Sequence, residues 1–227
     1  TCVKAVAEAI QSGYRMIDTA EAYGNEKEVG AGIRASGTDR RELFLVTKVN
    51  FKSYEHAEQT VMQSLENLGT DYLDLLLLHW PFANYYGAWR ALEKLYEAGK
   101  VRAIGVSNFQ IHHLEELKKI SGIVPAVNQI ECHPLCYPKE LIEYCQSEGI
   151  QVQAYAPLAR GAYLDNDVMC VLGTKYAHTP AQVGLRWAIQ KGISVIPKSV
   201  NPDRIVSNAN IFDFNIEDED MAIMDTL

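Results

Sequence analysis

The 227-residue sequence lacks any apolar run long enough to cross a membrane. Its longest, from Leu73 to Leu78, is interrupted by Asp74, whereas a membrane-spanning helix needs about 20 apolar residues. The chain also lacks the positive charge that nucleic acids and anionic membranes attract, because 29 acidic residues outnumber 21 Lys and Arg and give a net charge of −8. We therefore expect no nucleic-acid or membrane partner and a small molecule instead.

Cysteine is scarce and shows no pairing pattern. The five cysteines contain no CxxC pair and leave an odd count, which favours reduced thiols in a cytoplasmic protein. Cys132, His133 and Cys136 are close in sequence but do not form an ordered four-ligand set. We therefore expect structural thiols and no metal site.

Short β-rich segments alternate with segments of helical periodicity. The expected helices include 54–68, 88–98 and 110–120, each with an apolar stripe. The expected strands are 14–18, 43–48, 73–79, 101–108, 126–131, 150–155 and 193–198. This alternation predicts one α/β domain over residues 1–227, with parallel strands and crossover helices. Both an open doubly wound sheet and a (β/α)8 TIM barrel satisfy it.

A glycine motif helps to choose between the two folds. The segment "GAGIRA", Gly30 to Ala35, matches the dinucleotide fingerprint of the open sheet, but it lies inside an expected helix instead of after a strand, so we attribute the match to chance. A closed barrel is therefore expected. Because a barrel needs eight strands and the sequence shows seven, we expect the first strand before Thr1 and a C-terminal tail after Leu227, in a protein of about 270 to 280 residues.

Polar residues gather where the expected strands end. These residues are Asp18, Lys48, His79, Ser107, Asn108, Gln129, Tyr155 and Lys198. Taken singly, each has a structural explanation as a cap, a surface charge or a satisfied core group. A (β/α)8 enzyme, however, builds its active site at the carboxyl ends of its strands. Several such residues on adjacent strand ends therefore predict a catalytic site.

Seven segments together resemble the aldo-keto reductase family. They are "GYRMIDTAEAYGNE", "VTK", "LLLLHWP", "GKVRAIGVSNF", "VNQIECHP", "AYAPLARG" and "IPKSVNPDRI", and they run from Gly13 to near the end of the chain. The resemblance is strongest to microbial aldehyde and 2,5-diketo-D-gluconate reductases and to microbial prostaglandin F synthases. It implies a (β/α)8 barrel that reduces aldehydes or ketones with NADPH and has no Rossmann domain.

The resemblance also implies a role for each catalytic residue. Hydride addition to a carbonyl leaves an alkoxide that needs a proton, and Tyr23 would donate it. An isolated phenol releases its proton reluctantly at neutral pH, but the Lys48 ammonium about 4 Å away would stabilise the phenolate by roughly 4 kcal/mol. Asp18 would keep that lysine charged, and His79 would donate a hydrogen bond to the carbonyl oxygen. Trp80 would line the substrate pocket.

A second group of residues is implied to hold the cofactor. The group consists of Ser107, Asn108, Gln129, Tyr155, Lys198, Ser199, Arg204 and Asn208. Ser107, Asn108 and Gln129 would bind the nicotinamide carboxamide. Tyr155 would stack on the nicotinamide ring. Two cations beside a serine in an acidic chain suit the adenosine 2′-phosphate, which favours NADPH over NADH. As an alternative, an asparagine at 108 also suits the N-cap of the next helix.

Three functions are compatible with these features. The leading hypothesis is an NADPH-dependent carbonyl reductase, expected to be a monomer as is commonest in the family. A cofactor-binding regulatory protein without turnover is the second hypothesis. A barrel hydrolase that uses His79 with a metal is the third, although the sequence offers no ligand cluster for it. The identity of the carbonyl substrate is not encoded in these motifs, because barrel enzymes change substrate through their loops.

Overall fold

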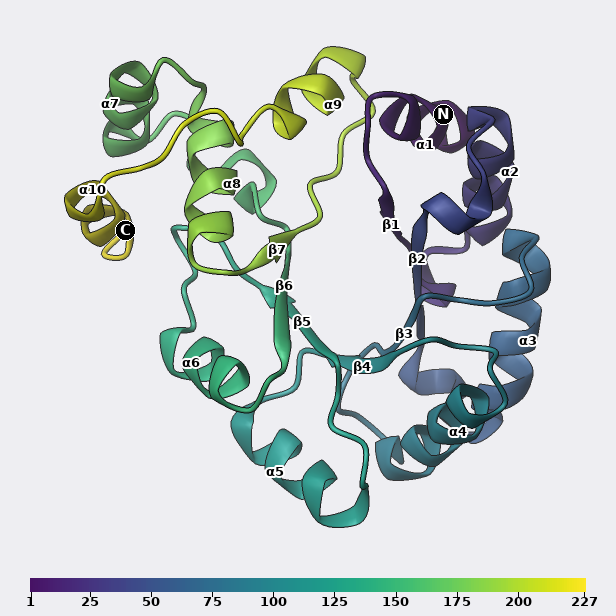
Figure 1. Cartoon of the computed structure of the whole chain (residues 1–227). Coiled ribbons are helices and arrows are strands. Elements are labelled where there is room, and N and C mark those ends of the chain that lie inside the picture. The colour runs from purple at the N-terminus through teal and green to yellow at the C-terminus, as the bar shows by residue number, and fades with distance from the viewer. The chain divides into compact units, whose positions relative to one another are not determined.

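A computed structural model describes all of residues 1–227, which divide into two compact units, Thr1–Asn128 and Gln129–Leu227. Helices and strands alternate along the chain in both units (Figure 1). The order of the seven strands in the sheet is their order in the sequence. The expected alternation of parallel strands and crossover helices is therefore confirmed.

The first unit contains four complete strands. They are β1 (Met16–Asp18), β2 (Phe44–Val49), β3 (Leu75–Leu78) and β4 (Ile104–Ser107). Its helices are α1 (Cys2–Gln11), α2 (Glu26–Ser36), α3 (Ala57–Leu68), α4 (Tyr85–Glu97) and α5 (Ile111–Ile120), with short 3-10 segments η1 (Glu21–Tyr23), η2 (Arg40–Glu42) and η3 (Phe51–His56). The "GAGIRA" segment lies within α2, which confirms that it is no dinucleotide loop.

The second unit continues the same alternation. Its strands are β6 (Gln151–Tyr155) and β7 (Ser194–Val195), which are parallel, and β5 (Val127–Glu131) begins in the first unit and ends in the second. Its helices are α6 (Lys139–Ser147), α7 (Asp167–Tyr176), α8 (Pro180–Gln190), α9 (Pro202–Ala209) and α10 (Asp218–Met224), with the 3-10 segment η4 (Ala159–Gly161). Tyr155 therefore lies at the carboxyl end of its strand, as expected.

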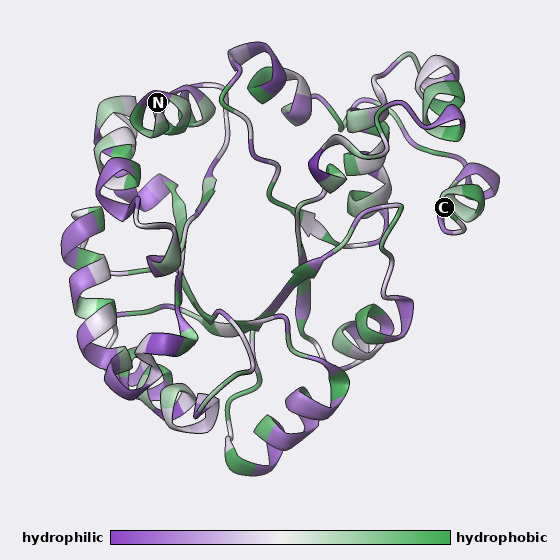
Figure 2. Cartoon of the chain, turned by 180° about the vertical axis from the view of Figure 1, so that it is seen from behind, coloured by the Kyte–Doolittle hydropathy of each residue, from purple (hydrophilic) through white to green (hydrophobic).

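Burial explains why all four residues of β3 are leucine. The four residues of β3 are each at most 1% exposed, as expected for a parallel strand that is covered on both faces. Leu75 and Leu77 pack with Val46 in one buried cluster, against which Met16 and Val127 also pack. Figure 2 shows hydrophobic residues along the strands and many hydrophilic residues on the helices.

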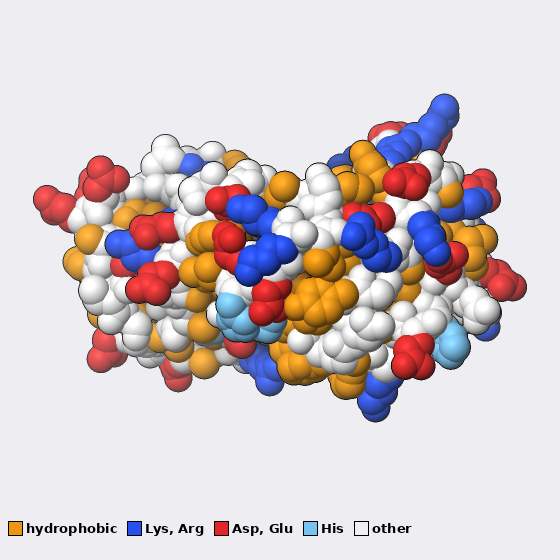
Figure 3. Space-filling view, turned by 90° about the horizontal axis from the view of Figure 1, so that it is seen from below, with side chains coloured by type: hydrophobic (Ala, Val, Ile, Leu, Met, Phe, Trp, Pro, Cys, Tyr) orange, Lys and Arg blue, Asp and Glu red, His pale blue; other side chains and the backbone are white.

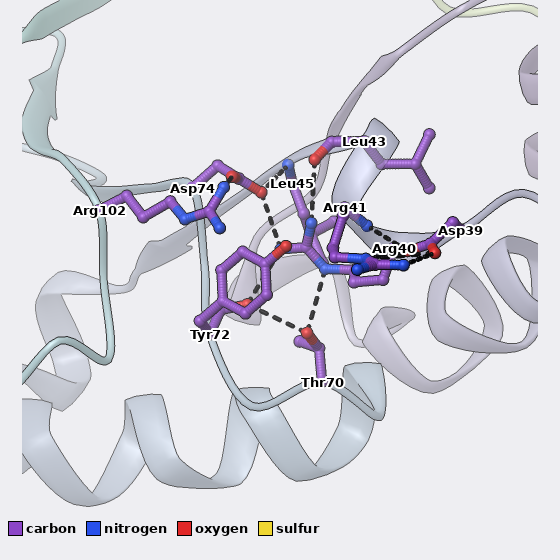
Figure 4. Close-up of polar contacts among 9 residues, drawn as sticks. All are labelled: Asp39, Arg40, Arg41, Leu43, Leu45, Thr70, Tyr72, Asp74 and Arg102. Carbon is purple, nitrogen blue, oxygen red and sulfur yellow. Dashed lines mark hydrogen bonds and ion pairs between the residues drawn. The ribbon is translucent and has the colours of Figure 1, made fainter.

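A network of charged residues ties the amino ends of three strands together (Figure 4). Asp74, just before β3, forms ion pairs with Arg40 at 2.8 Å and Arg102 at 3.0 Å and accepts a hydrogen bond from Leu45 N at 2.9 Å. The ring of Tyr72 lies 4.1 and 4.2 Å from those two guanidinium groups. Since this end of a barrel serves stability more than chemistry, the network holds the strands in register for the opposite end.

The carboxyl ends of the strands were predicted better than their beginnings. The first six expected strands end within one residue of the observed ones, but 101–108 begins in the structure only at Ile104. The expected strand 193–198 is reduced to Ser194–Val195, because Pro197 has no N–H to continue the ladder. The helix expected from residue 88 begins at Tyr85, where the Asn84 side chain accepts from Gly87 N at 3.1 Å.

Two further features concern the surface of the chain. No helix combines the length and the apolar character needed to span a membrane. On the face drawn in Figure 3, basic and acidic side chains are interspersed instead of forming one continuous basic patch.

Candidate active site

The register of the first four strands brings the polar strand ends to one edge of the sheet. Asp18 pairs with Val46, two residues before Lys48, and Lys48 itself pairs with Leu77, two residues before His79. Beyond the ladder, His79 N donates to Val49 O at 3.1 Å. Parallel pairing therefore places these three side chains at successive positions along the same edge.

Lys48 is the most buried charged group of the site. Its side chain is fully buried, and its Nζ donates to Asp18 Oδ1 and to Thr19 O, the latter at 2.9 Å. Burying an ammonium costs several kcal/mol of desolvation free energy, and the ion pair with Asp18 offsets that cost.

Tyr23 lies over this ion pair at the end of η1. The Lys48 Nζ is 5.2 Å from the centroid of its ring, and the His79 ring meets it edge-on at 5.9 Å. Tyr23 is 53% exposed, so the side chain is not enclosed by the fold. Gly24 closes the turn with a φ of +64°, a conformation that glycine adopts without strain. The structure thus brings Asp18, Tyr23, Lys48 and His79 together.

His79 is electrically neutral at physiological pH. Burial, together with the positive charge of Lys48, lowers its pKa to about 4. Its Nδ1 is buried without a hydrogen-bond partner. Because an orphaned buried N–H is rarer than an orphaned acceptor, the favoured tautomer has a bare Nδ1 and carries its proton on Nε2. His79 is therefore a neutral hydrogen-bond donor.

Ser107 and Asn108 end the fourth strand beside His79. Ser107 is buried, and Asn108 Nδ2 donates to Ser107 Oγ and to His79 O, each at 3.1 Å. The alternative role of Asn108 as an N-cap is wrong, because Gln110 caps α5 and its N donates to His113 Nδ1 at 3.1 Å. Asn108 instead has a left-handed φ of +64° and joins β4 to His79.

Aromatic residues that the sequence did not single out extend the site beyond Trp80. The Trp80 ring stacks on Phe82 at 5.4 Å, and Phe82 meets Phe51 edge-on at 5.5 Å. Phe82 is half exposed. Neither phenylalanine lies in a periodic segment, so no sequence pattern marked them.

The remaining expected cofactor residues belong to the second unit. Gln129 is buried and donates through Nε2 to Gln153 Oε1 at 2.5 Å, while Tyr155 is half-buried. Asn208 is buried on α9. Gln129 and Tyr155 lie on the strands that the sequence predicted for them.

A cationic pair lies around the start of α9. Lys198 and Arg204 are exposed, and neither side chain forms an ion pair. Between them, Ser199 Oγ accepts from Asn201 N at 3.1 Å, and Asn201 caps the helix by accepting from Arg204 N at 3.2 Å. Unpaired cations next to a helix N-terminus form a suitable environment for an anion.

The cysteines form no bridges, and all five are free. Burial raises the pKa of Cys132 to about 12, so it stays a neutral thiol. No three His, Cys, Asp or Glu side chains are grouped so that they could hold a metal ion.

Comparison with known proteins places this geometry in a family. The profile described as "Aldo/keto reductase family" matches residues 1–227. The chain belongs to the aldo/keto reductase family. Members of this family are oxidoreductases that reduce carbonyls with nicotinamide cofactors.

Individual aldo/keto reductases resemble the chain over nearly its whole length. Glyoxal reductase of Bacillus subtilis (strain 168) is 52% identical over 227 residues, which cover 99% of this chain and 82% of that protein. The 9,11-endoperoxide prostaglandin H2 reductase of Trypanosoma cruzi (strain CL Brener) is 48% identical over 229 residues, covering 98% and 81%.

A solved structure settles the fold class. The crystal structure of an aldo/keto reductase from Brucella melitensis has a TM-score of 0.96 and 43% identity, and the match covers 99% of this chain and 89% of that one. The expected (β/α)8 barrel type is thereby confirmed, with seven of its strands in this chain.

The neutral state of His79 gives a testable prediction. Nitrogen-15 NMR of the histidine rings from pH 4 to pH 8 should show His79 as the Nε2–H tautomer at pH 7, with a titration midpoint of about 4. Since an unfolded histidine takes up its proton near pH 6.5, this group should lower the stability of the fold as the pH falls from about 6.5 to 4. A midpoint near 6.5 would contradict the assignment.

Proposed function

We propose that this chain reduces aldehydes or ketones to alcohols with NADPH, and that Tyr23 donates the proton. The observation that carries the proposal is the convergence of Tyr23 and His79 above a fully buried Lys48 that is ion-paired with Asp18. Tyr23 would supply a proton, His79 a hydrogen bond to the carbonyl oxygen, and Lys48 a fixed positive charge. Each of the three contributions lowers the barrier to carbonyl reduction.

The chain's own residues handle the oxygen of the substrate. When bound, NADPH supplies a hydride to the carbonyl carbon, and the oxygen then carries the displaced electron pair. Tyr23 gives its proton to that oxygen and becomes a phenolate. The Lys48 ammonium stabilises the phenolate, and Asp18 keeps the ammonium charged.

His79 orients the carbonyl and does not act as the acid. Its pKa of about 4 leaves it without a surplus proton at neutral pH, but its Nε2–H can donate a hydrogen bond to the oxygen as negative charge develops there. Trp80, stacked next to it, would line the substrate pocket. Because the 52% identical relative is named for glyoxal, a small aldehyde, glyoxal is our first choice of test substrate.

The cofactor residues suit a phosphate-bearing nicotinamide. Lys198 and Arg204 are unpaired cations beside Ser199, an arrangement that favours the 2′-phosphate that distinguishes NADPH from NADH. We assign the carboxamide to Ser107, Asn108 and Gln129. Tyr155 would stack on the nicotinamide ring and Asn208 would contact the adenosine end. We further propose that residues 1–227 act as a single barrel domain in a cytoplasmic monomer.

Replacing the proton donor tests the central step. Tyr23→Phe should lower kcat for glyoxal by about 10²- to 10⁴-fold, the usual contribution of general acid catalysis, and should leave NADPH binding intact. Binding is followed by quenching of tryptophan fluorescence and turnover by NADPH absorbance. Tyr96→Phe, at another exposed tyrosine outside the site, is the matched control. Full activity of Tyr23→Phe would refute the assignment.

Replacing the cations tests the choice of cofactor. Lys198→Ala and Arg204→Ala should each raise the KM for NADPH by about 10- to 100-fold, because a hydrogen bond to a charged group is lost. The KM for NADH should change little, since NADH has no 2′-phosphate. Lys139→Ala, an exposed lysine on α6, controls for net charge. Equal effects on both cofactors would argue against a 2′-phosphate site.

A further inference from the structure

The backbone of Trp80, the residue after His79, is hydrogen-bonded by a side chain instead of by a neighbouring strand. β3 ends at Leu78, yet both backbone groups of Trp80 are bound by Tyr54. The Tyr54 hydroxyl donates to Trp80 O at 2.5 Å and accepts from Trp80 N at 3.2 Å. One phenol therefore replaces the missing ladder at the point where the chain leaves the sheet.

Tyr54 is suited to this double role. It lies in η3 and is only 4% exposed. Burial raises its pKa well above the ordinary value, so the phenol keeps its proton and can both donate and accept at any pH at which the enzyme works.

His79 depends on its backbone for positioning because no hydrogen bond fixes Nδ1 of its ring. Histidines that act on a ligand commonly have the second ring nitrogen fixed by a hydrogen bond, whereas Nδ1 of His79 has no partner. The hydrogen bonds that fix its place are on the backbone: His79 N to Val49 O, and Asn108 Nδ2 to His79 O at 3.1 Å. The Tyr54 contacts lock the next residue, so they limit how the His79 backbone can rotate.

The same short segment also holds the loop of Tyr23. Glu21, the first residue of η1, accepts from Asn50 N at 2.8 Å and from Ser53 Oγ at 2.5 Å. Asn50 caps η3, and Ser53 precedes Tyr54 within it. η3 and its cap therefore form hydrogen bonds both to the segment that carries Tyr23 and to the segment that carries His79.

We infer that η3 is the common support that fixes Tyr23 and His79 relative to each other, with Tyr54 and Glu21 as positioning residues. The inference rests on the proposed function for its effect on turnover. Neither residue touches the reacting atoms, so neither is catalytic. A displacement of about 1 Å in such a site is enough to cost about 10²-fold in rate.

Tyr54→Phe tests this inference, since it removes the hydroxyl and keeps the ring. We expect kcat for glyoxal to fall about 10- to 100-fold while the KM and the affinity for NADPH stay close to those of the wild type. Tyr85→Phe is the matched control. Tyr85 is also buried, and its hydroxyl bonds Tyr86 and Glu116 away from the site, so its loss should leave kcat unchanged.

Two further measurements separate positioning from a general loss of stability. In a His79→Gln background, Tyr54→Phe should add almost no further loss of kcat, because the two residues act through one group. The ring nitrogen-15 signals of His79 should shift in Tyr54→Phe and not in Tyr85→Phe. Losses that multiply, or unshifted His79 signals, would overturn the inference.

The NMR signal also keeps this test distinct from that of the proposed function. If the wild type failed to reduce any carbonyl but its His79 signals still shifted in Tyr54→Phe, only the proposed function would fall. Should Tyr54→Phe not fold, Ser53→Ala replaces it by cutting one of the two bonds to Glu21. We then expect a smaller drop in kcat that disappears in a Tyr23→Phe background, and a drop that persists there would overturn the inference.

Discussion

The site depends on one buried positive charge. Lys48 is completely enclosed, and its hydrogen bonds to Asp18 and the Thr19 carbonyl compensate for the water that it has lost. That charge lies beside both of the other candidate catalytic groups. Lys48 Nζ is 5.2 Å from the centroid of the Tyr23 ring, and together with burial it keeps His79 neutral. In the proposed mechanism, this one ion pair between two strand ends therefore supports different roles for the tyrosine and the histidine.

The candidate catalytic side chains are positioned partly by the register of the strands and partly by the segments that follow the strands. Parallel pairing brings Asp18, Lys48 and His79 to one edge, and the Asp74 network secures the opposite ends of β2, β3 and β4. The sheet cannot position Tyr23, which lies five residues beyond the end of β1. The 3-10 segment η3 is hydrogen-bonded both to that loop and to the residues after β3. The relative placement of Tyr23 and His79 therefore depends on irregular structure as well as on the sheet.

The alternation of strands and helices and the polar strand ends could be predicted from the sequence, because both follow from local pattern. Sequence pattern predicted less well the features that depend on tertiary contacts. Pro197 shortens the last strand, and Asn108 serves His79 instead of capping α5. Phe82 could not be found, since it lies outside the periodic segments. Tyr54 fell at the start of the expected helix 54–68, but its role depends on Trp80, a partner distant in sequence. The family resemblance, confirmed over residues 1–227, supplied the expected role of each catalytic residue, which pattern alone does not give.

The measurement that tests this account most directly is the kcat for glyoxal reduction by NADPH in Lys48→Met, Tyr23→Phe and the combined variant. If Lys48 acts by stabilising the Tyr23 phenolate, removing the tyrosine hydroxyl makes the lysine irrelevant to the proton step. The combined variant should then be about as slow as the slower single variant. Losses that multiply would show that the two residues act independently and would contradict the account.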